Sequence, residues 1–389
     1  MNDTPIGLYV HLPWCERKCP YCDFNSHQVR GALAEHVYVD ALLQDLDTEL
    51  QGRAPPTIGS VFIGGGTPSL FSAAAIARLL EGLAHRSRFV DDVEITLEAN
   101  PGSAETARLR GYIAAGVNRL SLGIQSFDAR QLLRLGRVHD ADEAHAAIAM
   151  ARGAGCTNLN LDLMFGLPQA APGDALRDLE QAIAHAPEHI SWYQLTLEEG
   201  TAFARQPPAL PGHDQICDDY DAGVDLMASA GYRQYEISAY ARSARSSRHN
   251  LNYWLFGDYI GIGAGAHGKR TDATGGVWRT ARIRSPERYI KAAREGLAID
   301  SEAQVSGLTL ATEFMLNALR LAGGFDMSLF SARTGLPLAS LQEPLAAAQA
   351  RGWLAQHGDC LKPTAQGFRF LTDLQLLFTG LEESPAVAG

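Results

Sequence analysis

The stretch Cys15-Glu16-Arg17-Lys18-Cys19-Pro20-Tyr21-Cys22 contains three of the six cysteines of the chain. Three cysteines this close suit a metal centre, because they cannot all pair with one another as disulfides. Zinc usually takes four ligands, and no second Cys/His cluster at zinc-ribbon spacing follows in the sequence. An iron–sulfur cluster held by three cysteines, with one iron left open, agrees better with this count. The alternatives are a zinc clip and three cysteines that hold no metal.

The composition is that of a globular protein with a sizeable core. The chain has 389 residues, of which 46% are hydrophobic and 20% charged, and this length predicts two or three domains. The formal net charge of −11 argues against a general nucleic-acid binder. No apolar run approaches the ~20 residues of a membrane-spanning helix. Met1-Asn2-Asp3-Thr4 has neither the basic nor the apolar part of a signal peptide. We therefore expect a cytoplasmic protein, in a compartment that keeps thiolates reduced.

Short apolar strands alternate with helical patterns through the first two thirds of the chain. Six strand-then-helix units predict an α/β fold, a partial (β/α)6 barrel with a parallel sheet. The expected strands cover 6–12, 60–63, 93–97, 119–124, 158–164 and 189–196. The expected helices lie near 33–50, 72–85, 103–115, 129–135, 140–154 and 173–186.

The last part of the chain changes character from about residue 305. Two or three helices followed by a short β-wing predict a winged-helix-like α+β domain. We expect a barrel domain at 1–240, a connecting segment at 241–304 and the C-terminal domain at 305–380. Residues 305–379 contain five basic and five acidic side chains, which leaves no basic face for nucleic acid. A lid or a partner contact is the expected role of this domain.

Polar residues that can carry chemistry follow the expected strands, where ligands of such barrels bind. Gly64-Gly65-Gly66-Thr67 ends one strand, and its backbone can approach a ligand that a Cβ would block. The alternative is a plain tight turn. Glu98, Gln125 and Asp162 end or follow the next strands and are candidate ligand contacts, with helix capping as the alternative. Arg137 is a candidate carboxylate contact or a solvated surface arginine.

A second motif, His249-Asn250-Leu251-Asn252-Tyr253-Trp254, combines an imidazole with two aromatic rings. Imidazole is an iron ligand, and aromatic rings stack on a flat conjugated molecule, so heme is a candidate ligand. The alternative is a loop whose aromatic rings pack beneath the barrel. Arg242, Arg245 and Arg248 lie just upstream. They either pair with heme propionates or form a solvated arginine run.

Together these motifs closely resemble the oxygen-independent coproporphyrinogen III oxidase-like family of radical S-adenosylmethionine (radical SAM) proteins, HemN/HemW. The matching stretches are 9–24, 64–68, 120–126 and 162–168. The resemblance implies a [4Fe–4S] cluster on Cys15, Cys19 and Cys22, whose open iron chelates SAM. It also implies SAM contacts from Tyr9, Tyr21, Gly65, Gly66, Thr67, Glu98, Gln125, Arg137 and Asp162, with further ones near Thr196 and His267.

Two features separate the branches of this family. The oxidase branch resembles this chain in its cysteine spacing but has a fourth cysteine, C-x3-C-x2-C-x-C, where this chain has Phe24. That branch also has a long segment before the cluster, whereas Cys15 lies near the start of this sequence. The motif at 249–254 matches the HemW branch, which resembles heme-binding chaperones.

The resemblance therefore implies a protein that passes heme to an acceptor protein, with heme contacts from His249, Asn250, Tyr253 and Trp254. The alternative is oxidative decarboxylation of coproporphyrinogen III to protoporphyrinogen IX by a 5′-deoxyadenosyl radical. We expect neither a nucleic-acid partner nor an integral membrane segment. SAM cleavage in function and homodimer formation stay open.

Overall fold

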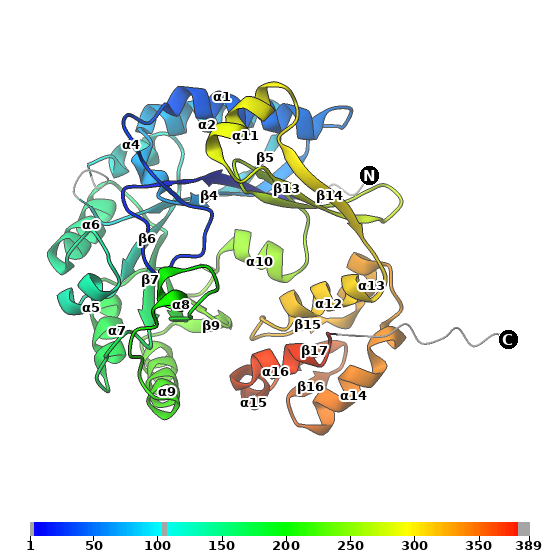
Figure 1. Cartoon of the computed structure of the whole chain (residues 1–389). Coiled ribbons are helices and arrows are strands. Elements are labelled where there is room, and N and C mark those ends of the chain that lie inside the picture. Colours follow the sequence, from blue (N-terminus) through cyan, green and yellow to red (C-terminus); the bar gives the residue numbers. More distant parts are fainter. Residues whose placement is uncertain (1–3, 103–106, 380–389) are drawn as a thin grey trace.

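The computed structural model describes residues 4–102 and 107–379, and its centre is a row of six parallel strands (Figure 1). Each strand pairs in parallel with the next one, so the predicted α/β fold with six strand-then-helix units is confirmed. The strands are β1 (Ile6–Leu12), β4 (Thr57–Gly65), β5 (Arg88–Ala99), β6 (Arg119–Gln125), β7 (Leu159–Phe165) and β8 (His189–Gln194).

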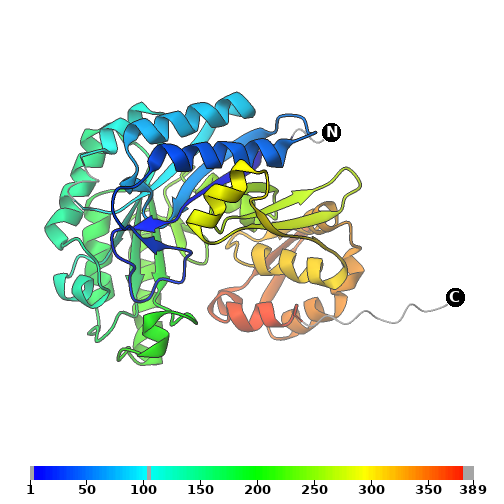
Figure 2. The same ribbon diagram turned by 45° about the horizontal axis from the view of Figure 1, so that its top comes forward.

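Helices connect these strands. They are α1 (Glu35–Leu50), α2 (Ala73–Arg86), α4 (Leu109–Ala114), α5 (Ala129–Arg134), α6 (Ala141–Gly153) and α7 (Asp174–Ala184), with the 3-10 turn η1 (Pro68–Leu70) after β4. The helix expected near 103–115 begins in the structure at Leu109, and residues 103–106 lie outside the described part of the chain. Figure 2 shows the helices of the first half of the chain, blue to green, along the outside of the sheet.

Further strands extend both edges of this sheet to twelve. On one side, β11 (Tyr259–Ile262) pairs in parallel with β1, and β12 (His267–Thr271), β13 (Val277–Arg282) and β14 (Ile299–Val305) follow antiparallel. On the other side lie β10 (Ala239–Ala241) and β9 (Arg233–Glu236), both antiparallel. The remaining helices of this part of the chain are α8 (Ala202–Arg205), α9 (His213–Ser229), α10 (Arg248–Trp254) and α11 (Pro286–Arg294). The segment 241–304, expected as a connector, thus also supplies four strands, and its boundaries stay a prediction.

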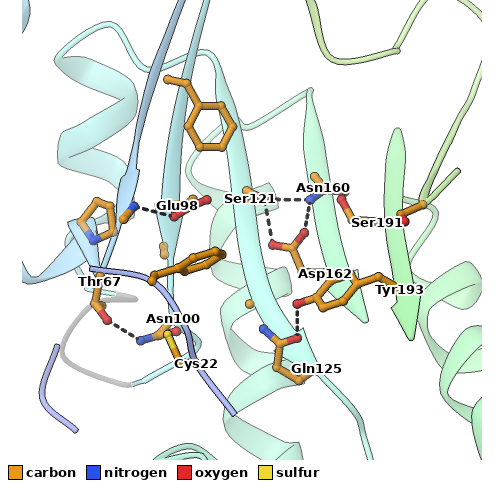
Figure 3. Close-up of a pocket in the computed structure, with 18 of the residues that line it drawn as sticks. Cys22, Thr67, Glu98, Asn100, Ser121, Gln125, Asn160, Asp162, Ser191 and Tyr193 are labelled. Atoms are coloured by element: carbon orange, nitrogen blue, oxygen red, sulfur yellow. Dashed lines mark hydrogen bonds between the residues drawn. The ribbon is translucent and has the colours of Figure 1, made fainter. Parts of the chain in front are cut away.

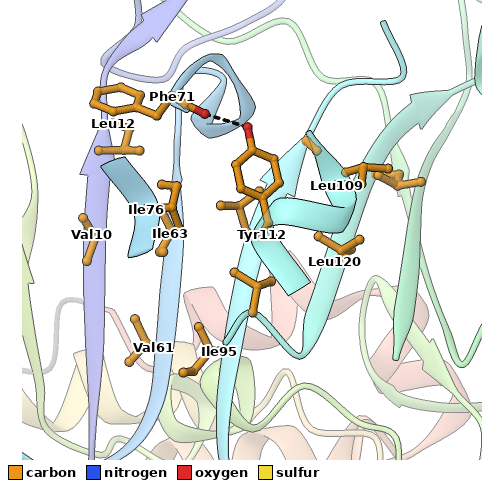
Figure 4. Packing of buried hydrophobic residues seen from close by; sticks show 14 of the residues in the cluster. Val10, Leu12, Val61, Ile63, Phe71, Ile76, Ile95, Leu109, Tyr112 and Leu120 are labelled. Atoms are coloured by element: carbon orange, nitrogen blue, oxygen red, sulfur yellow. Dashed lines mark hydrogen bonds between the residues drawn. The ribbon is translucent and has the colours of Figure 1, made fainter. Parts of the chain in front are cut away.

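The two faces of each parallel strand differ because successive side chains point to opposite sides of a sheet. Apolar residues such as Val61, Ile95 and Leu120 face the helices and are buried against Ile76 and Tyr112 (Figure 4). The residues between them are mostly polar and face the barrel interior. The interior is therefore a polar cavity and not a packed core.

The C-terminal domain matches the expected winged-helix-like α+β arrangement and has its own core around Phe314 and Phe330. It joins the barrel at one edge, where Leu321 bridges to Glu236 of β9. In Figure 1 it lies beside the barrel, with α10 between the two. Its elements are α12 (Gly307–Ala318), β15 (Phe325–Asp326), α13 (Met327–Thr334), η2 (Leu338–Leu341), α14 (Gln342–Ala350), β16 (Leu354–His357), β17 (Cys360–Pro363), α15 (Ala365–Arg369) and α16 (Leu371–Leu376).

Within the described residues, no helix combines the length and the apolar character that crossing a membrane requires.

Candidate functional site

A cavity of about 510 Å³ occupies the barrel interior and opens towards the cysteine loop (Figure 3). It brings together most of the residues that the sequence singled out, although they come from seven separate segments. Its wall includes Cys15, Cys19, Tyr21, Cys22, Gly65, Gly66, Thr67, Glu98, Gln125, Arg137, Asp162, Asn250 and Trp254.

Five of the named residues lie elsewhere, and two of them, His249 and Tyr253, are described below with α10. Tyr9 and His267 line a second cavity of about 480 Å³, which Glu98 and Tyr253 also border. Tyr9 donates its hydroxyl hydrogen to Nδ1 of His11 at 2.9 Å, while Nε2 of that imidazole lies 2.9 Å from the carbonyl oxygen of Asn25. Thr196 is exposed and donates to Glu198.

The cysteine loop is held at both ends by hydrogen bonds. Short strands β2 (Trp14–Cys15) and β3 (His27–Gln28) pair within it. The side-chain amide of Asn25 donates to the carbonyl oxygens of Ala264 (2.8 Å) and Arg284 (2.9 Å). The guanidinium of Arg17 donates to the backbone carbonyls of Gly136 and Arg137. The loop is therefore ordered by the rest of the protein.

The three cysteines fit a three-cysteine cluster. Each thiol is free of disulfides and borders the same cavity. Burial raises the pKa of Cys15 and Cys22, so a cationic centre is what would hold them as thiolates. Among the described residues no three His, Cys, Asp or Glu side chains gather around a single point. A cluster does not require this, because each cysteine binds a different iron.

The glycines after β4 serve the packing of the protein itself. A Cβ on Gly66 would lie 2.5 Å from the carbonyl oxygen of Trp14, and one on Gly65 would lie 2.6 Å from the ring of His11. The backbone amide of Gly66 donates to Leu12 and that of Thr67 to Trp14. The missing side chains therefore let the cysteine loop pack on β4. The ligand contacts expected from Gly65 and Gly66, which both line the main cavity, stay a prediction.

A chain of hydrogen bonds links the cysteine loop to the glycine loop. Nη1 of Arg137 lies 3.8 Å from the sulfur of Cys19, and Nη2 donates to Oδ1 of Asn100 (2.6 Å) and to the carbonyl oxygen of Gly123 (2.8 Å). Nδ2 of Asn100 then donates to Oγ1 of Thr67 at 3.1 Å. Arg137 is thus held inside the site, and Asn100 connects the two loops.

Two carboxyl groups inside the barrel have raised pKa values. Asp162 accepts hydrogen bonds from Ser121 (2.9 Å) and Asn160 (2.8 Å), and burial raises its pKa. Burial, reinforced by the nearby charge of Asp162, raises the pKa of Glu98 to about 8. A protonated Glu98 can donate a hydrogen bond as well as accept one, which suits a ligand with hydroxyl groups.

Gln125 ends β6 in a strained conformation. Its φ angle is 68°, a left-handed value that is uncommon for residues other than glycine. Its Oε1 accepts a hydrogen bond from the hydroxyl of Tyr193 at 2.9 Å. The strain turns this amide into the cavity at the point where the strand ends.

The motif at 249–254 forms a short helix, α10, and its side chains divide between two directions. The imidazole of His249 is 1% exposed, with Nδ1 2.9 Å from the hydroxyl oxygen of Ser60 and Nε2 3.0 Å from that of Tyr253. Both ring nitrogens are therefore occupied within the protein. Asn250 and Trp254 lie one helical turn apart and face the main cavity.

The arginine run before α10 lies outside the described lining of the main cavity. Arg242 donates to the carbonyl oxygen of Pro187, just before β8, and Arg248 pairs with Asp92 in β5 at 2.9 Å. These partners lie near the N-terminal ends of the strands, whereas the cysteine loop lies at the C-terminal ends.

Sequence reasoning missed several residues of the cavity wall: Asn100, Arg119, Ser121, Asn160, Ser191 and Tyr193. A usable signal was present. The strands read LSLGIQ, LNLDLM and ISWYQ, in which polar residues alternate with apolar ones. Alternation in a parallel strand, whose two faces are usually both apolar, indicates a polar interior.

Comparisons with known proteins agree with this architecture. The model of the Radical SAM superfamily matches residues 9–182, and that of the HemN C-terminal domain matches residues 305–370. The solved structure of coproporphyrinogen III oxidase (HemN) from Escherichia coli superposes with a TM-score of 0.81 over 96% of this chain and 90% of that one. Its sequence identity is 23%, so this likeness shows a shared fold.

Curated relatives are more similar in sequence. The chain is 45% identical to the heme chaperone HemW of Haemophilus influenzae, over 96% of this chain and 98% of that protein. Identity and coverage are the same for HemW of Escherichia coli. The mitochondrial radical S-adenosyl methionine domain-containing protein 1 of Mus musculus is 43% identical over 74% of this chain and 66% of that protein.

Proposed function

Because this chain belongs to the HemW family of radical SAM proteins, we propose that it is a heme chaperone, which binds heme and transfers it to an acceptor protein. Its radical SAM domain implies a [4Fe–4S] cluster and SAM. Helix α10 supports the proposal most directly: it brings Asn250 and Trp254 into the same cavity as the three cysteines. A flat ligand on the Trp254 ring would therefore lie next to the cluster and SAM.

The two ends of the cavity would hold different ligands. Cys15, Cys19 and Cys22 would hold the cluster, which when bound supplies one-electron chemistry to SAM. Arg137 and Thr67, joined through Asn100, would hold SAM at the cysteine end. α10 would hold heme farther inside.

His249 acts through its neighbours in this conformation. It connects β4 to Tyr253, so it positions the aromatic side of α10. Direct bonding of its imidazole to the heme iron would require release of Ser60 or Tyr253. We therefore infer that His249 positions the motif until heme enters.

Phe24, two residues after the last cysteine of the loop, favours heme handling over porphyrinogen decarboxylation. Phe24 occupies the position at which the oxidase motif has its fourth cysteine. Its side chain is 60% exposed and borders both cavities. Heme, an acceptor protein and a cytoplasmic location are thus the predicted setting of this chain.

Heme titration of the anaerobically reconstituted protein tests the proposal. We expect a saturable shift of the Soret band with the wild type, and binding roughly tenfold to hundredfold weaker for Trp254→Ala, which removes the stacking surface. Trp278→Ala on β13, outside the described lining of the main cavity, is the matched control and should bind like the wild type. Absence of a Soret shift in the wild type would remove the proposal.

A second assay separates the chaperone from the oxidase. The same protein receives dithionite, SAM and coproporphyrinogen III, and in parallel heme-loaded protein meets an apo-hemoprotein. We expect heme transfer and no protoporphyrinogen. Formation of protoporphyrinogen would instead favour the oxidase.

A further inference from the structure

Arg119 is a buried arginine at the inner end of the main cavity whose Nε lacks an acceptor among the described residues. It begins β6 two residues before Ser121, so it faces the barrel interior, one strand period deeper than that serine. The residue is 2% exposed and lines the cavity. Its Nε has no hydrogen-bond partner within the described residues, and no salt bridge holds its guanidinium there.

Three further donors on the same cavity wall are unsatisfied within the described residues, and one of them, Nε of Arg137, lies at the cysteine end. Nε1 of Trp254 and Nε of Arg320 are buried and, like that of Arg119, lack a partner in the part of the chain that the structure describes. The guanidinium of Arg320 lies 4.2 Å from the centre of the Trp254 ring. The bridge between Glu236 and Leu321 places Arg320, a residue of the C-terminal domain, at the barrel edge.

Glu98 and Asp162 are the two carboxyl groups whose pKa values, raised by burial, are lowered in part by the charge of Arg119, and Glu98 accepts a hydrogen bond from the backbone amide of Gly65 at 3.2 Å. Glu236 and Glu94 are likewise used by other donors. Glu236 accepts from Arg320 at 3.1 Å and from the backbone amide of Ser238 at 3.1 Å. Glu94 accepts from the backbone amides of Arg248 and His249. Asp162 is held by Ser121 and Asn160, as described above. Buried N–H groups without an acceptor are rare in native proteins, and here the missing group is an acceptor.

We propose that Arg119, together with Arg320 and the indole N–H of Trp254, binds a carboxylate of the ligand that enters the barrel. This rests on the proposed function, which makes that carboxylate a propionate of heme. A planar guanidinium matches a carboxylate through two parallel hydrogen bonds. The cavity then has two arginine sites, Arg137 at the cysteine end and Arg119 at the inner end.

A ligand bound at this site would contact both domains. Arg119 belongs to the barrel, Arg320 to the C-terminal domain and Trp254 to the helix between them. A bound propionate would therefore contact all three, and displacement of the C-terminal domain from the barrel edge would remove one of its three contacts.

Heme and its dimethyl ester, in which both propionates are esterified, test the proposal on the full reconstituted chain. We expect Arg119→Gln to bind heme roughly tenfold to hundredfold more weakly than the wild type, because a charge-assisted hydrogen bond is lost. The ester should bind equally to both proteins. Arg119→Lys keeps the charge and should lose less affinity than Arg119→Gln. Arg130→Gln, a change of an exposed arginine on α5, is the control and should bind heme like the wild type.

Two further measurements show which ligand carries the carboxylate and whether Arg119 serves the stability of the fold. SAM carries a carboxylate too, and SAM affinity should be unchanged in Arg119→Gln. Thermal unfolding of the ligand-free variant should occur at nearly the same temperature as that of the wild type, because Nε of Arg119 has no acceptor within the described residues that the substitution could remove.

The outcomes separate the two proposals. Equal heme affinity of Arg119→Gln and wild type, or equal losses for heme and its ester, would overturn the propionate site and leave the chaperone function standing. A loss of SAM affinity with heme affinity unchanged would assign the carboxylate to SAM and also overturn it. Absence of heme binding by the wild type would remove both.

Discussion

The two faces of the parallel strands are stabilised in different ways. On the outer face, Leu97, Leu120 and Leu161 are fully buried against the helices, and shape and apolar area account for their stabilising effect. On the inner face, Ser121 and Asp162 depend on specific hydrogen bonds. Within the described residues, the inner face lacks acceptors at both ends, at Nε of Arg137 beside the cysteine loop and at Nε of Arg119 at the inner end, whereas the outer face has one such donor, Nε1 of Trp192. The unpaired donors of the inner face indicate that a ligand completes the interior.

Adjacent residues of β6 give the sharpest test of this difference. Leu120→Ala should lower the free energy of unfolding by about 2–5 kcal/mol, because it leaves a cavity in the outer core. Ser121→Ala should cost about 1–3 kcal/mol, since Asp162 and Asn160 each lose a hydrogen bond. Chemical denaturation measures both, and SAM affinity should fall in Ser121→Ala alone. A loss of SAM affinity in Leu120→Ala with Ser121→Ala unaffected would reverse the assignment of the two faces.

The pH dependence of stability should report the buried carboxyl group of Glu98. Its pKa is raised from 4.5 to about 8 in the folded protein, so folding retains a proton that the unfolded chain releases. Its contribution to stability is therefore complete below about pH 4.5 and is lost as the pH rises towards 8, by about 1.4 kcal/mol per pH unit.

Glu98→Gln isolates this effect, because the amide does not titrate. The variant and the wild type should have similar stabilities near pH 5, and the variant should be the more stable one at pH 9. Thermal unfolding of SAM-free protein across this range measures the difference. Parallel pH profiles for the two proteins would show that Glu98 is ionised in the fold.

Asn100 should have the smallest of these effects. Asn100→Ala separates Arg137 from Thr67, and we expect SAM affinity to fall roughly tenfold with little change in stability. Asn317→Ala removes a side-chain amide in α12 outside the described lining of the main cavity and is the matched control. Isothermal titration with SAM compares the three proteins. Equal affinities in all three would mean that the two loops are held together without Asn100.

Much of the architecture could be predicted from local patterns. Apolar runs of strand length followed by helical periodicity predicted the six parallel strands, because these patterns reflect which side chains a strand or helix buries. The spacing of Cys15, Cys19 and Cys22 predicted their common site for a similar reason, since eight residues cannot spread far apart. Residues from other segments, such as Glu98 and Asp162, were predicted through the position of strand ends in a barrel.

Other features depend on contacts between distant segments. The sequence cannot show that β11 pairs with β1, or that both nitrogens of His249 are occupied by Ser60 and Tyr253. Asn100 was not singled out in the sequence, because its role comes from two loops that meet only in the fold. The arginine run at 242–248 was a candidate for binding propionates, with a solvated run as the alternative, and it lies outside the described lining of the main cavity, whereas the buried Arg119 lines it.

The amino-acid sequence by itself determined the strands, the helices and the cysteine loop, because periodicity and short-range spacing act within a few residues. The tertiary structure alone decided which polar groups find a partner. An arginine at the start of a strand is a common residue, and its lack of an acceptor depends on every segment packed around it. The cavity in which Nε of Arg119, Nε1 of Trp254 and Nε of Arg320 lack acceptors among the described residues exists only after the barrel and the C-terminal domain have come together.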